Sequence, residues 1–173
     1  AREGRRLQIE GFSPCFILLN NDLSDGIPDS LMGLSQTIDP LPELGWFARS
    51  KAHHFTLYES VCREFASLIG IDVWKISPLF EDCTPVDIMA GDGLDCLLRQ
   101  AESLFDRIQT KYHEYKIQSS PFLILKPNSG TYGQGVMTLR HPSDIKQLNR
   151  KQRQNLARRK GNQPVTHVLL QEG

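Results

Sequence analysis

Apolar residues recur every three or four positions in two long segments of the chain. The first stripe comprises Phe55, Leu57, Tyr58, Val61, Phe65, Leu68 and Ile69, and the second comprises Leu97, Leu98, Ala101, Leu104, Phe105 and Ile108. This spacing places apolar side chains on one face of a helix. Gly70 and Pro121 are natural stops after these segments. We therefore predict amphipathic helices over about 53–69 and 94–115.

Short, continuous apolar runs predict strands elsewhere. They lie at residues 15–19, 122–125, 136–139 and 165–171. Such runs, bounded by turn-forming residues, are typical of buried strands. The first would be a central strand that ends in the polar loop Asn20–Asp22. The second and third would form a hairpin across the loop 127–135, and a helix would follow over about 142–159.

The order of these elements changes near Ser119. Strands and helices alternate before it, as in an α/β layered fold, whereas strand–loop–strand–helix–strand follows it. We therefore predict an α/β fold in two parts, residues 1–118 and residues 119–173. No initiator Met or apolar signal core opens the sequence, so we expect an interior piece of a longer chain.

Composition excludes several classes of protein. Hydrophobic residues make up 39% and charged residues 23%, enough apolar material for a core. The formal net charge is zero, so nothing global indicates nucleic acid or an anionic membrane, and no apolar run approaches the roughly 20 residues of a membrane helix. The cysteines form no CxxC pair, and we expect buried, reduced thiols in a cytoplasmic protein; no feature of the sequence supports the alternative of a catalytic Cys–His pair.

The sharpest chemical pattern is a lysine at a strand end followed by a glycine-rich loop. Lys126 ends the strand 122–125, and Gly130, Gly133 and Gly135 follow it. Glycine lets backbone N–H groups approach an anion closely, and consecutive N–H groups can form an anion-binding concavity. Lysine adds a compact positive charge suited to phosphate oxygens. The pattern favours a flap over a nucleotide triphosphate, although a plain glycine-rich hairpin with an exposed lysine would have the same residues.

Other nucleotide-binding motifs do not fit this loop. No GxxxxGK[ST] sequence is present, so it is not a Walker loop. The glycine spacing differs from GxGxxG, and a strand follows where a dinucleotide-binding fold needs a helix. A kinase loop would place its lysine after the glycines.

The strand end at Gln171–Glu172 is a second, weaker signal. Its backbone groups and carboxylate could meet an adenine amino group or a ribose hydroxyl, although polar strand ends are common. Together, Lys126-Pro127, the loop through Gly135 and Gln171-Glu172-Gly173 resemble the ATP-grasp fold. The resemblance implies that Lys126 contacts phosphate and that Gln171 and Glu172 form the adenine hinge. The flap would comprise Ser129, Gly130, Thr131, Tyr132, Gly133, Gln134 and Gly135.

Longer stretches narrow this resemblance to the ATP-grasp-type glutamate–cysteine ligases of proteobacteria. They are Leu18–Ser24, Gly45-Trp46, Arg49–Lys51 with His54-Phe55, Met89–Cys96 and Leu148–Arg153. The resemblance implies that ATP phosphorylates the γ-carboxylate of L-glutamate. The amine of L-cysteine then attacks the acyl phosphate to give γ-glutamylcysteine, the first step of glutathione biosynthesis. A different acceptor, as in a glutathione-synthetase-like ligase, is the nearest alternative.

The resemblance also implies ATP and Mg²⁺ as cofactors. The family's acidic and Asn magnesium ligands lie beyond the adenine hinge, so we expect them downstream of Gly173 and none in this chain. An N-terminal region of the family is also missing. We therefore expect no turnover from this piece alone, and no catalytic residue is assigned.

Polar residues outside the loop are candidates for substrate binding. Asn20, Asn21 and Asp22 follow a strand, the usual place for a ligand in an α/β sheet, although an Asx turn would look the same. The basic residues Arg49 and Lys51, with His54, stand at a helix start and could bind a carboxylate or phosphate, although a solvated helix start is an equal alternative.

Two further charged segments have structural interpretations. Asp92 or Asp95 would cap the helix that starts at Leu94, because the spacing of acids in that loop lacks the Glu of a calcium site. The basic run 146–160 could bind nucleic acid in a non-catalytic module. It has no interleaved aromatic residue, so a solvated helix face is the simpler interpretation.

Overall fold

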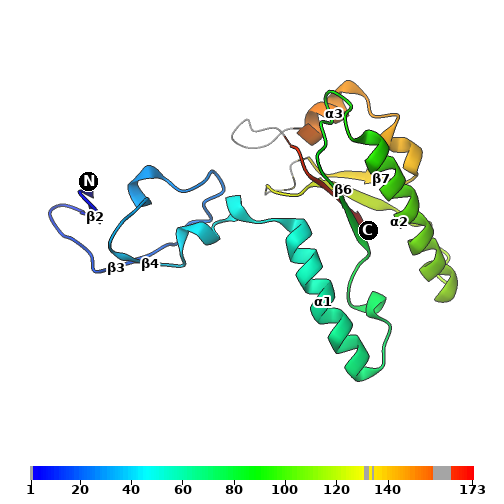
Figure 1. Cartoon of the computed structure of the whole chain (residues 1–173), viewed down its shortest axis with the longest axis horizontal. Helices are drawn as coiled ribbons and strands as arrows, with labels where there is room; N and C mark the ends of the chain where they lie inside the picture. The colour runs from blue at the N-terminus through cyan, green and yellow to red at the C-terminus, as the bar shows by residue number, and fades with distance from the viewer. Residues whose placement is uncertain (1, 131–132, 134, 158–164) are drawn as a thin grey trace. The chain divides into compact units, whose positions relative to one another are not determined.

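The computed structural model describes residues 2–130, 133, 135–157 and 165–173. The chain divides into two compact units, Ala1–Arg49 and Ser50–Gly173. The division falls at a different place from the boundary expected near Ser119, because elements on both sides of Ser119 share one sheet and one core. Figure 1 shows the elements of each unit.

Unit 1 is built from two small sheets. Antiparallel β1 (Arg2–Glu3) and β2 (Arg6–Leu7) form one, and parallel β3 (Phe16–Leu18) and β4 (Thr37–Asp39) form the other. Short 3-10 helices cover Asp29–Leu31, Pro42–Leu44 and Trp46–Ala48. The strand predicted at residues 15–19 therefore exists, but its prediction as a central strand is wrong: β3 pairs with β4 alone in its sheet, and Leu18 is 72% exposed.

Unit 2 begins with α1 (Lys51–Ile69), which confirms the first predicted helix. The Ser50 hydroxyl accepts a hydrogen bond from the His53 amide and caps the helix start. Gly70 ends the helix in the left-handed conformation at φ 70°, as its position predicted. Much of the apolar stripe of α1 is nevertheless exposed, including Leu68 at 83%.

A four-stranded antiparallel sheet forms the centre of unit 2, in the order β5–β8–β6–β7. The strands are β5 (Phe80–Cys83), β6 (Leu123–Pro127), β7 (Met137–Leu139) and β8 (Val168–Glu172). The predicted β6–β7 hairpin is confirmed. β5 was missed because its sequence, Phe-Glu-Asp-Cys, has no apolar run. The last strand along the chain thus lies inside the sheet.

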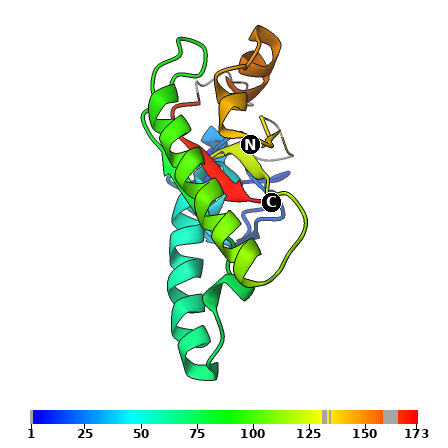
Figure 2. The ribbon, with the colours of Figure 1, turned by 90° about the vertical axis from the view of Figure 1, so that its right-hand side faces the viewer.

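One face of this sheet packs against α2 (Leu94–Glu114), the second predicted helix. Figure 2 shows α2 crossing in front of the strands. The fully buried contacts include Leu97, Leu104 and Ile108 of the helix and Leu125 and Leu170 of the sheet. Helix residues three, four or seven positions apart thus pack against alternate residues of the strands.

The predicted cap of α2 is wrong. Gly93, at φ 78°, precedes the helix, and no side chain caps it. A Cβ on Gly93 would lie 2.6 Å from the Pro85 carbonyl oxygen, so the close approach requires glycine. Asp92 instead joins Asp87 through a backbone bridge, and Asp95 lies in the first helical turn.

The prediction of a single helix over 142–159 is also wrong for the described residues of that segment. A 3-10 helix (Pro142–Ile145) is followed by the separate α3 (Arg150–Ala157). Asn149 and Gln152 exchange amide-to-side-chain hydrogen bonds of 2.9 Å each, which starts a new helix at that point. Another 3-10 helix covers Val73–Lys75. None of the described helices is long and apolar enough to cross a membrane.

Candidate functional site

The loop lysine and the predicted hinge strand lie together. In the β6–β8 register Lys126 pairs with Leu169 and Ile124 pairs with Gln171, so Lys126 and Gln171 are diagonal neighbours on one face of the sheet. The Lys126 ammonium donates a hydrogen bond to Gln171 Oε1. It also lies 5.0 Å from the centre of the Phe55 ring of α1. The face that carries these groups is opposite the face covered by α2.

The glycine loop leaves β6 beside this lysine. Gly130, Gly133 and Gly135 have φ values of 107°, 68° and 69°, all in the left-handed region that favours glycine. A Cβ on Gly135 would lie 2.8 Å from Pro127 Cγ and 3.2 Å from the Leu156 carbonyl oxygen. Ser129 is half-buried. Thr131, Tyr132 and Gln134, which were also assigned to the flap, lie outside the described residues.

The first part of the loop is held by the N-terminus of α1. Lys51 Nζ donates to the carbonyl oxygens of Pro127 at 3.0 Å, Asn128 at 3.5 Å and Gly130 at 2.9 Å. The Lys51 amide also donates to the Asn128 carbonyl, at 2.9 Å. Lys51 was predicted to bind substrate, and the structure places its ammonium group on the backbone of the loop.

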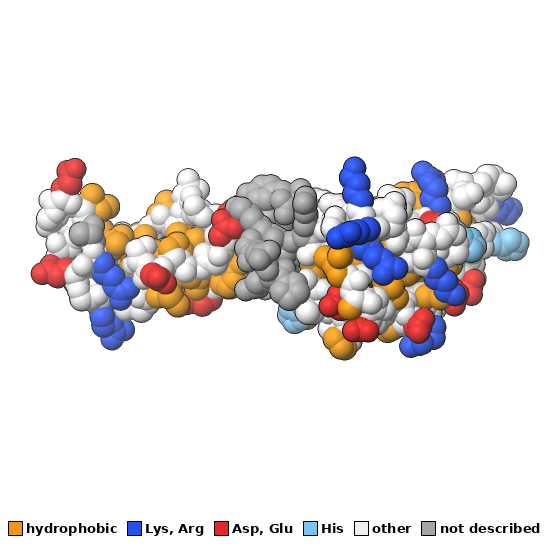
Figure 3. All heavy atoms as spheres, turned by 90° about the horizontal axis from the view of Figure 1, so that it is seen from above, with side chains coloured by type: hydrophobic (Ala, Val, Ile, Leu, Met, Phe, Trp, Pro, Cys, Tyr) orange, Lys and Arg blue, Asp and Glu red, His pale blue; other side chains and the backbone are white. Residues whose placement is uncertain are grey.

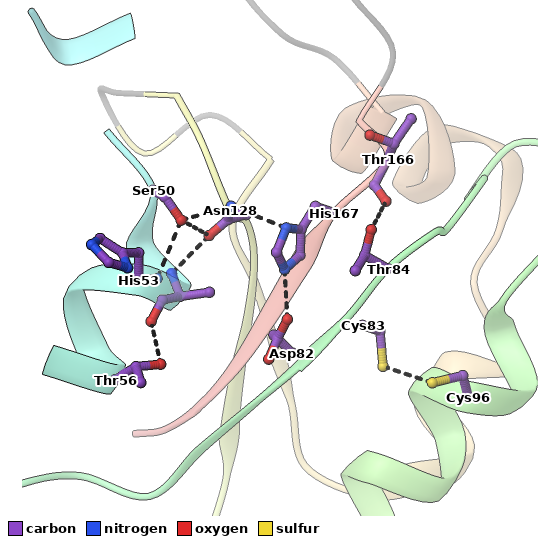
Figure 4. Close-up of polar contacts among 11 residues, drawn as sticks. Ser50, His53, Thr56, Asp82, Cys83, Thr84, Cys96, Asn128, Thr166 and His167 are labelled. Carbon is purple, nitrogen blue, oxygen red and sulfur yellow. Dashed lines mark hydrogen bonds and ion pairs between the residues drawn. The ribbon is translucent and has the colours of Figure 1, made fainter. Parts of the chain in front are cut away.

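Asn128 connects the loop to three other elements, as Figure 4 shows. Its buried Oδ1 accepts from the Ala52 amide at 2.7 Å, and its Nδ2 donates to Ser50 Oγ at 3.1 Å. Nδ2 also lies 3.1 Å from His167 Nδ1, and His167 Nε2 lies 2.7 Å from Asp82 Oδ2. The His167 ring therefore lies between the side chains of Asn128 and Asp82. The loop base is thus fixed to α1, β8 and β5.

Glu172 has a structural partner set on the other face of the sheet. Its carboxylate oxygens accept from Trp74 Nε1 at 3.0 and 2.8 Å and from the Leu79 amide at 3.0 Å. Burial, with the charge of Glu172 as a smaller cause, raises the pKa of Tyr112. Of the two residues assigned to the adenine hinge, Gln171 therefore lies on the face of Lys126, whereas the side chain of Glu172 supports the 3-10 helix Val73–Lys75.

A charged cluster surrounds that 3-10 helix. Asp72 accepts from Lys111 Nζ at 2.5 Å, from the Trp74 amide at 3.0 Å and from the Tyr115 hydroxyl at 2.9 Å. These contacts, chiefly the hydrogen bond from Lys111, lower the pKa of Asp72 from its ordinary 3.8 to about 2. The cluster joins the helix α2 to the segment that holds Glu172.

Four of the predicted substrate residues belong to unit 1. Asn20, Asn21 and Asp22 follow β3, and Asn21 Oδ1 and Asp22 Oδ1 accept from backbone amides two residues on, at 2.8 and 3.1 Å. This is the Asx-turn geometry that was the structural alternative. Arg49 Cζ lies 5.7 Å from the Trp46 ring centre. His54, on α1 in unit 2, stacks on Tyr58 with ring centres 6.1 Å apart.

The four cysteines are free thiols. Cys62 and Cys83 are buried as predicted, but Cys15 is exposed, so the prediction of burial is wrong for Cys15. Cys83 Sγ lies 3.3 Å from Cys96 Sγ, a contact between β5 and α2 that sequence spacing did not indicate. Burial, with the neighbouring Cys96 thiol, raises the pKa of Cys83. No group of three or more His, Cys, Asp or Glu side chains in the described parts of the chain could hold a metal ion.

Figure 3 shows the described lysine and arginine side chains interspersed with uncharged, apolar and acidic ones on the face that is seen. In the described part of the basic run, Lys146, Arg150 and Lys151 are exposed, whereas Arg153 is half-buried and its Nε donates to the Leu148 carbonyl at 3.1 Å. Arg158, Arg159 and Lys160 lie outside the described residues.

Sequence reasoning missed Phe55, Asn128 and His167 as parts of this site. Asn128 follows Lys126 by two residues, so it lies on the same face, and strand alternation could have identified it. His167 precedes an apolar strand by one residue, and no sequence pattern connects it with Asp82. Phe55 was assigned only to the apolar stripe of its helix.

The chain is similar to one known protein family and to a solved structure. The glutamate-cysteine ligase family matches residues 1–173. A crystal structure at 1.90 Å resolution of a protein from Methylobacillus flagellatus KT, proposed to be a gamma-glutamylcysteine synthetase, matches with 45% sequence identity and a TM-score of 0.87. The match covers 100% of this chain and 41% of that one. No curated protein sequence gives a match.

The chain therefore belongs to the glutamate-cysteine ligase family. The mixed α/β fold of this chain follows that of the matched structure over the whole length of this chain. The resemblance seen in the sequence motifs is confirmed at the level of the family.

Proposed function

We propose that this chain contributes part of the nucleotide site of an ATP-dependent ligase that joins the γ-carboxylate of L-glutamate to the amine of L-cysteine. The observation that carries the proposal is the meeting of Lys126 with Gln171 beside a loop of left-handed glycines. In an ATP-grasp arrangement these positions correspond to a phosphate lysine, an adenine hinge and a flap. Membership of the glutamate-cysteine ligase family supports the choice of substrates.

Lys126 would act on the phosphates through its charge. Its ammonium donates to Gln171 and lies near Phe55. A triphosphate oxygen is a stronger acceptor for an ammonium group than a neutral amide oxygen is, because it carries negative charge of its own. We propose that Lys126 turns from Gln171 to phosphate when nucleotide binds. Gln171 would then be able to meet the base.

The backbone of the loop would stabilise the same phosphates. Amide groups of residues 129–135 would donate to phosphate oxygens, and the left-handed glycines allow the chain to curve around them. Such fixed dipoles would stabilise the charge on the phosphoryl group as it passes from ATP to the γ-carboxylate oxygen, and the charge that develops on the ADP leaving group. Magnesium, when bound, would neutralise phosphate charge; the described residues do not offer a ligand set for it, so none is assigned here.

Asn20, Asn21, Asp22, Arg49 and His54 remain proposed contacts for the amino-acid substrates. The side-chain oxygens of Asn21 and Asp22 accept hydrogen bonds from backbone amides, and these bonds orient both side chains. The reaction consumes ATP, and we propose a cytoplasmic location for it. Incubation of the whole protein with ATP, glutamate and cysteine, followed by product analysis, distinguishes γ-glutamylcysteine from the product of another acceptor.

The central test is the Lys126→Ala variant of the whole protein. We expect its KM for ATP to rise at least about tenfold, because a charged hydrogen bond contributes about 1.5–3 kcal/mol. Lys116→Ala, at an exposed position after α2, serves as the control and should leave the KM unchanged. Unchanged ATP affinity in the Lys126 variant would refute the proposed nucleotide site.

A further inference from the structure

The ammonium group of Lys51 lies among three carbonyl oxygens at the base of the glycine loop. They belong to Pro127, Asn128 and Gly130, at 3.0, 3.5 and 2.9 Å. An ammonium group has three N–H donors and no acceptor. A substrate carboxylate or phosphate would therefore compete with the loop backbone for the donors of Lys51.

The carbonyl directions determine where the loop amides face. In a trans peptide the C=O of one residue and the N–H of the next point in opposite directions. The Asn128 carbonyl faces the Lys51 amide and ammonium group, so the Ser129 N–H faces away from them. Lys51 thus keeps the carbonyl oxygens, which would repel an anion, on one side of the loop base. The Ser129 N–H, which can donate to an anion, lies on the other side.

Asn128 reinforces this orientation from the side chain. Its Oδ1 accepts from the Ala52 amide, one of the first N–H groups of α1 that have no partner within the helix. Its own amide donates to the His167 carbonyl at 2.9 Å, which continues the pairing with β8. The loop base is therefore oriented by contacts within the protein.

We infer that Lys51 is a positioning residue, which acts on the nucleotide through the backbone of residues 127–130 and does not bind the amino-acid substrate. The inference rests on the proposed function, because it gives the loop the task of binding phosphate. It replaces the expectation that Lys51 contacts a substrate carboxylate. The ammonium orients the loop, and the loop amides meet the anion.

Lys51→Met in the whole protein is the first test, because methionine keeps a long unbranched side chain and removes the donors. We expect the KM for ATP to rise about tenfold, as for the loss of a charged hydrogen bond. The KM for glutamate should stay within about twofold of the unsubstituted protein, since the proposed role involves no contact with glutamate. Lys51→Arg, which keeps the charge and several donors, should restore part of the ATP affinity.

Amide hydrogen exchange of the loop, measured without nucleotide, provides a second readout. Exchange in peptides covering residues 126–136 should be faster in Lys51→Met than in the unsubstituted protein, while peptides of α2 exchange at the same rate. Unchanged exchange in α2 also shows that the variant is folded. Lys116→Met is the matched control and should alter neither exchange nor the KM values.

The possible results separate this inference from the proposed function. A raised KM for glutamate with an unchanged KM for ATP would overturn the inference and leave the nucleotide site intact. Unchanged loop exchange together with unchanged KM values would also overturn it. If Lys126→Ala leaves ATP affinity unaltered while Lys51→Met accelerates loop exchange, the nucleotide proposal fails and Lys51 is shown to order the loop for another purpose.

Discussion

Trp74 Nε1 donates to both carboxylate oxygens of Glu172, at distances of 3.0 and 2.8 Å. The two residues are 98 positions apart in sequence, and their contact ties the 3-10 helix Val73–Lys75 to the end of β8. Glu172 directly follows Gln171 in β8, so this contact lies on the opposite face of the sheet from the contact between Gln171 and Lys126.

We predict that Trp74→Phe lowers the free energy of unfolding by about 1–3 kcal/mol, the cost of removing the indole donor from a half-buried carboxylate that then keeps only the Leu79 amide. Phenylalanine keeps an aromatic ring against Tyr112 and Tyr115, so the lost group is the indole N–H. Urea unfolding of the whole protein measures the change. Trp46→Phe, at a position 44% exposed, is the control, and equal losses in both variants would contradict the role of the Glu172 contact.

Asp72 should make the protein sensitive to acid over a defined range of pH. Its pKa is lowered from 3.8 to about 2 in the folded state, so the folded protein binds this proton less readily than the unfolded protein does. The stabilisation is present above the unfolded pKa and is lost as the pH falls through the folded pKa. We therefore expect the unfolding free energy to fall more steeply between about pH 4 and pH 2 in the unsubstituted protein than in Asp72→Asn.

Urea unfolding at several pH values across that range measures the difference. Asp106→Asn, which removes an exposed carboxylate of α2, is the control and should keep the steep acid dependence. Parallel curves for Asp72→Asn and the unsubstituted protein would contradict the assignment of the lowered pKa to the Lys111 contact.

Gly135 and Gly133 offer a matched pair of loop substitutions. Their φ values are 69° and 68°, so alanine meets the same left-handed strain, about 1–2 kcal/mol, at either position. At Gly135 the new Cβ would also lie 2.8 Å from Pro127 Cγ, whereas no described atom lies within 4 Å of it at Gly133. We expect Gly135→Ala to reduce stability and ATP affinity more than Gly133→Ala does. Thermal unfolding and the KM for ATP measure both effects, and the reverse order would show that the Pro127 contact is unimportant.

The cysteines should differ in their rates of alkylation. Cys83 is 2% exposed, and burial raises its pKa, so little reactive thiolate is present at neutral pH. Cys15 is exposed. We expect iodoacetamide to label Cys15 first and Cys83 last in the native protein, as followed by peptide mass spectrometry. Denatured protein is the control, in which the two rates should converge; rapid labelling of native Cys83 would contradict its burial.

Local patterns predicted those elements whose residues carry their own signal. The helices α1 and α2 follow from apolar residues three and four apart, and Ser50 and Gly70 bound α1 by capping. The β6–β7 hairpin follows from two apolar runs around a glycine loop. β5 was missed because it has no apolar run of its own. It is stabilised by hydrogen bonds to β8 along one edge and by packing of one of its faces against α2.

The candidate site shows the same division. Lys126, the loop glycines and Gln171 could be identified from the sequence, because strand ends and glycines have local meaning. Lys51 was predicted to bind a substrate because it is a cation at a helix start. Its carbonyl partners lie 76, 77 and 79 residues away in the sequence, so no local pattern reveals them. The partners of a long polar side chain are set by the fold.

The sequence by itself determined the helices α1 and α2, the β6–β7 hairpin, the glycine loop and the family. Each of these depends on residues close together along the chain or on whole motifs. The tertiary structure decided that β8 enters the sheet between β5 and β6, which brings Gln171 to Lys126, and that α1 starts against the loop, which brings Lys51 to its carbonyl oxygens. The physical reason is that periodicity and capping act over a few residues, whereas strand order and buried polar contacts depend on how all the apolar faces pack together.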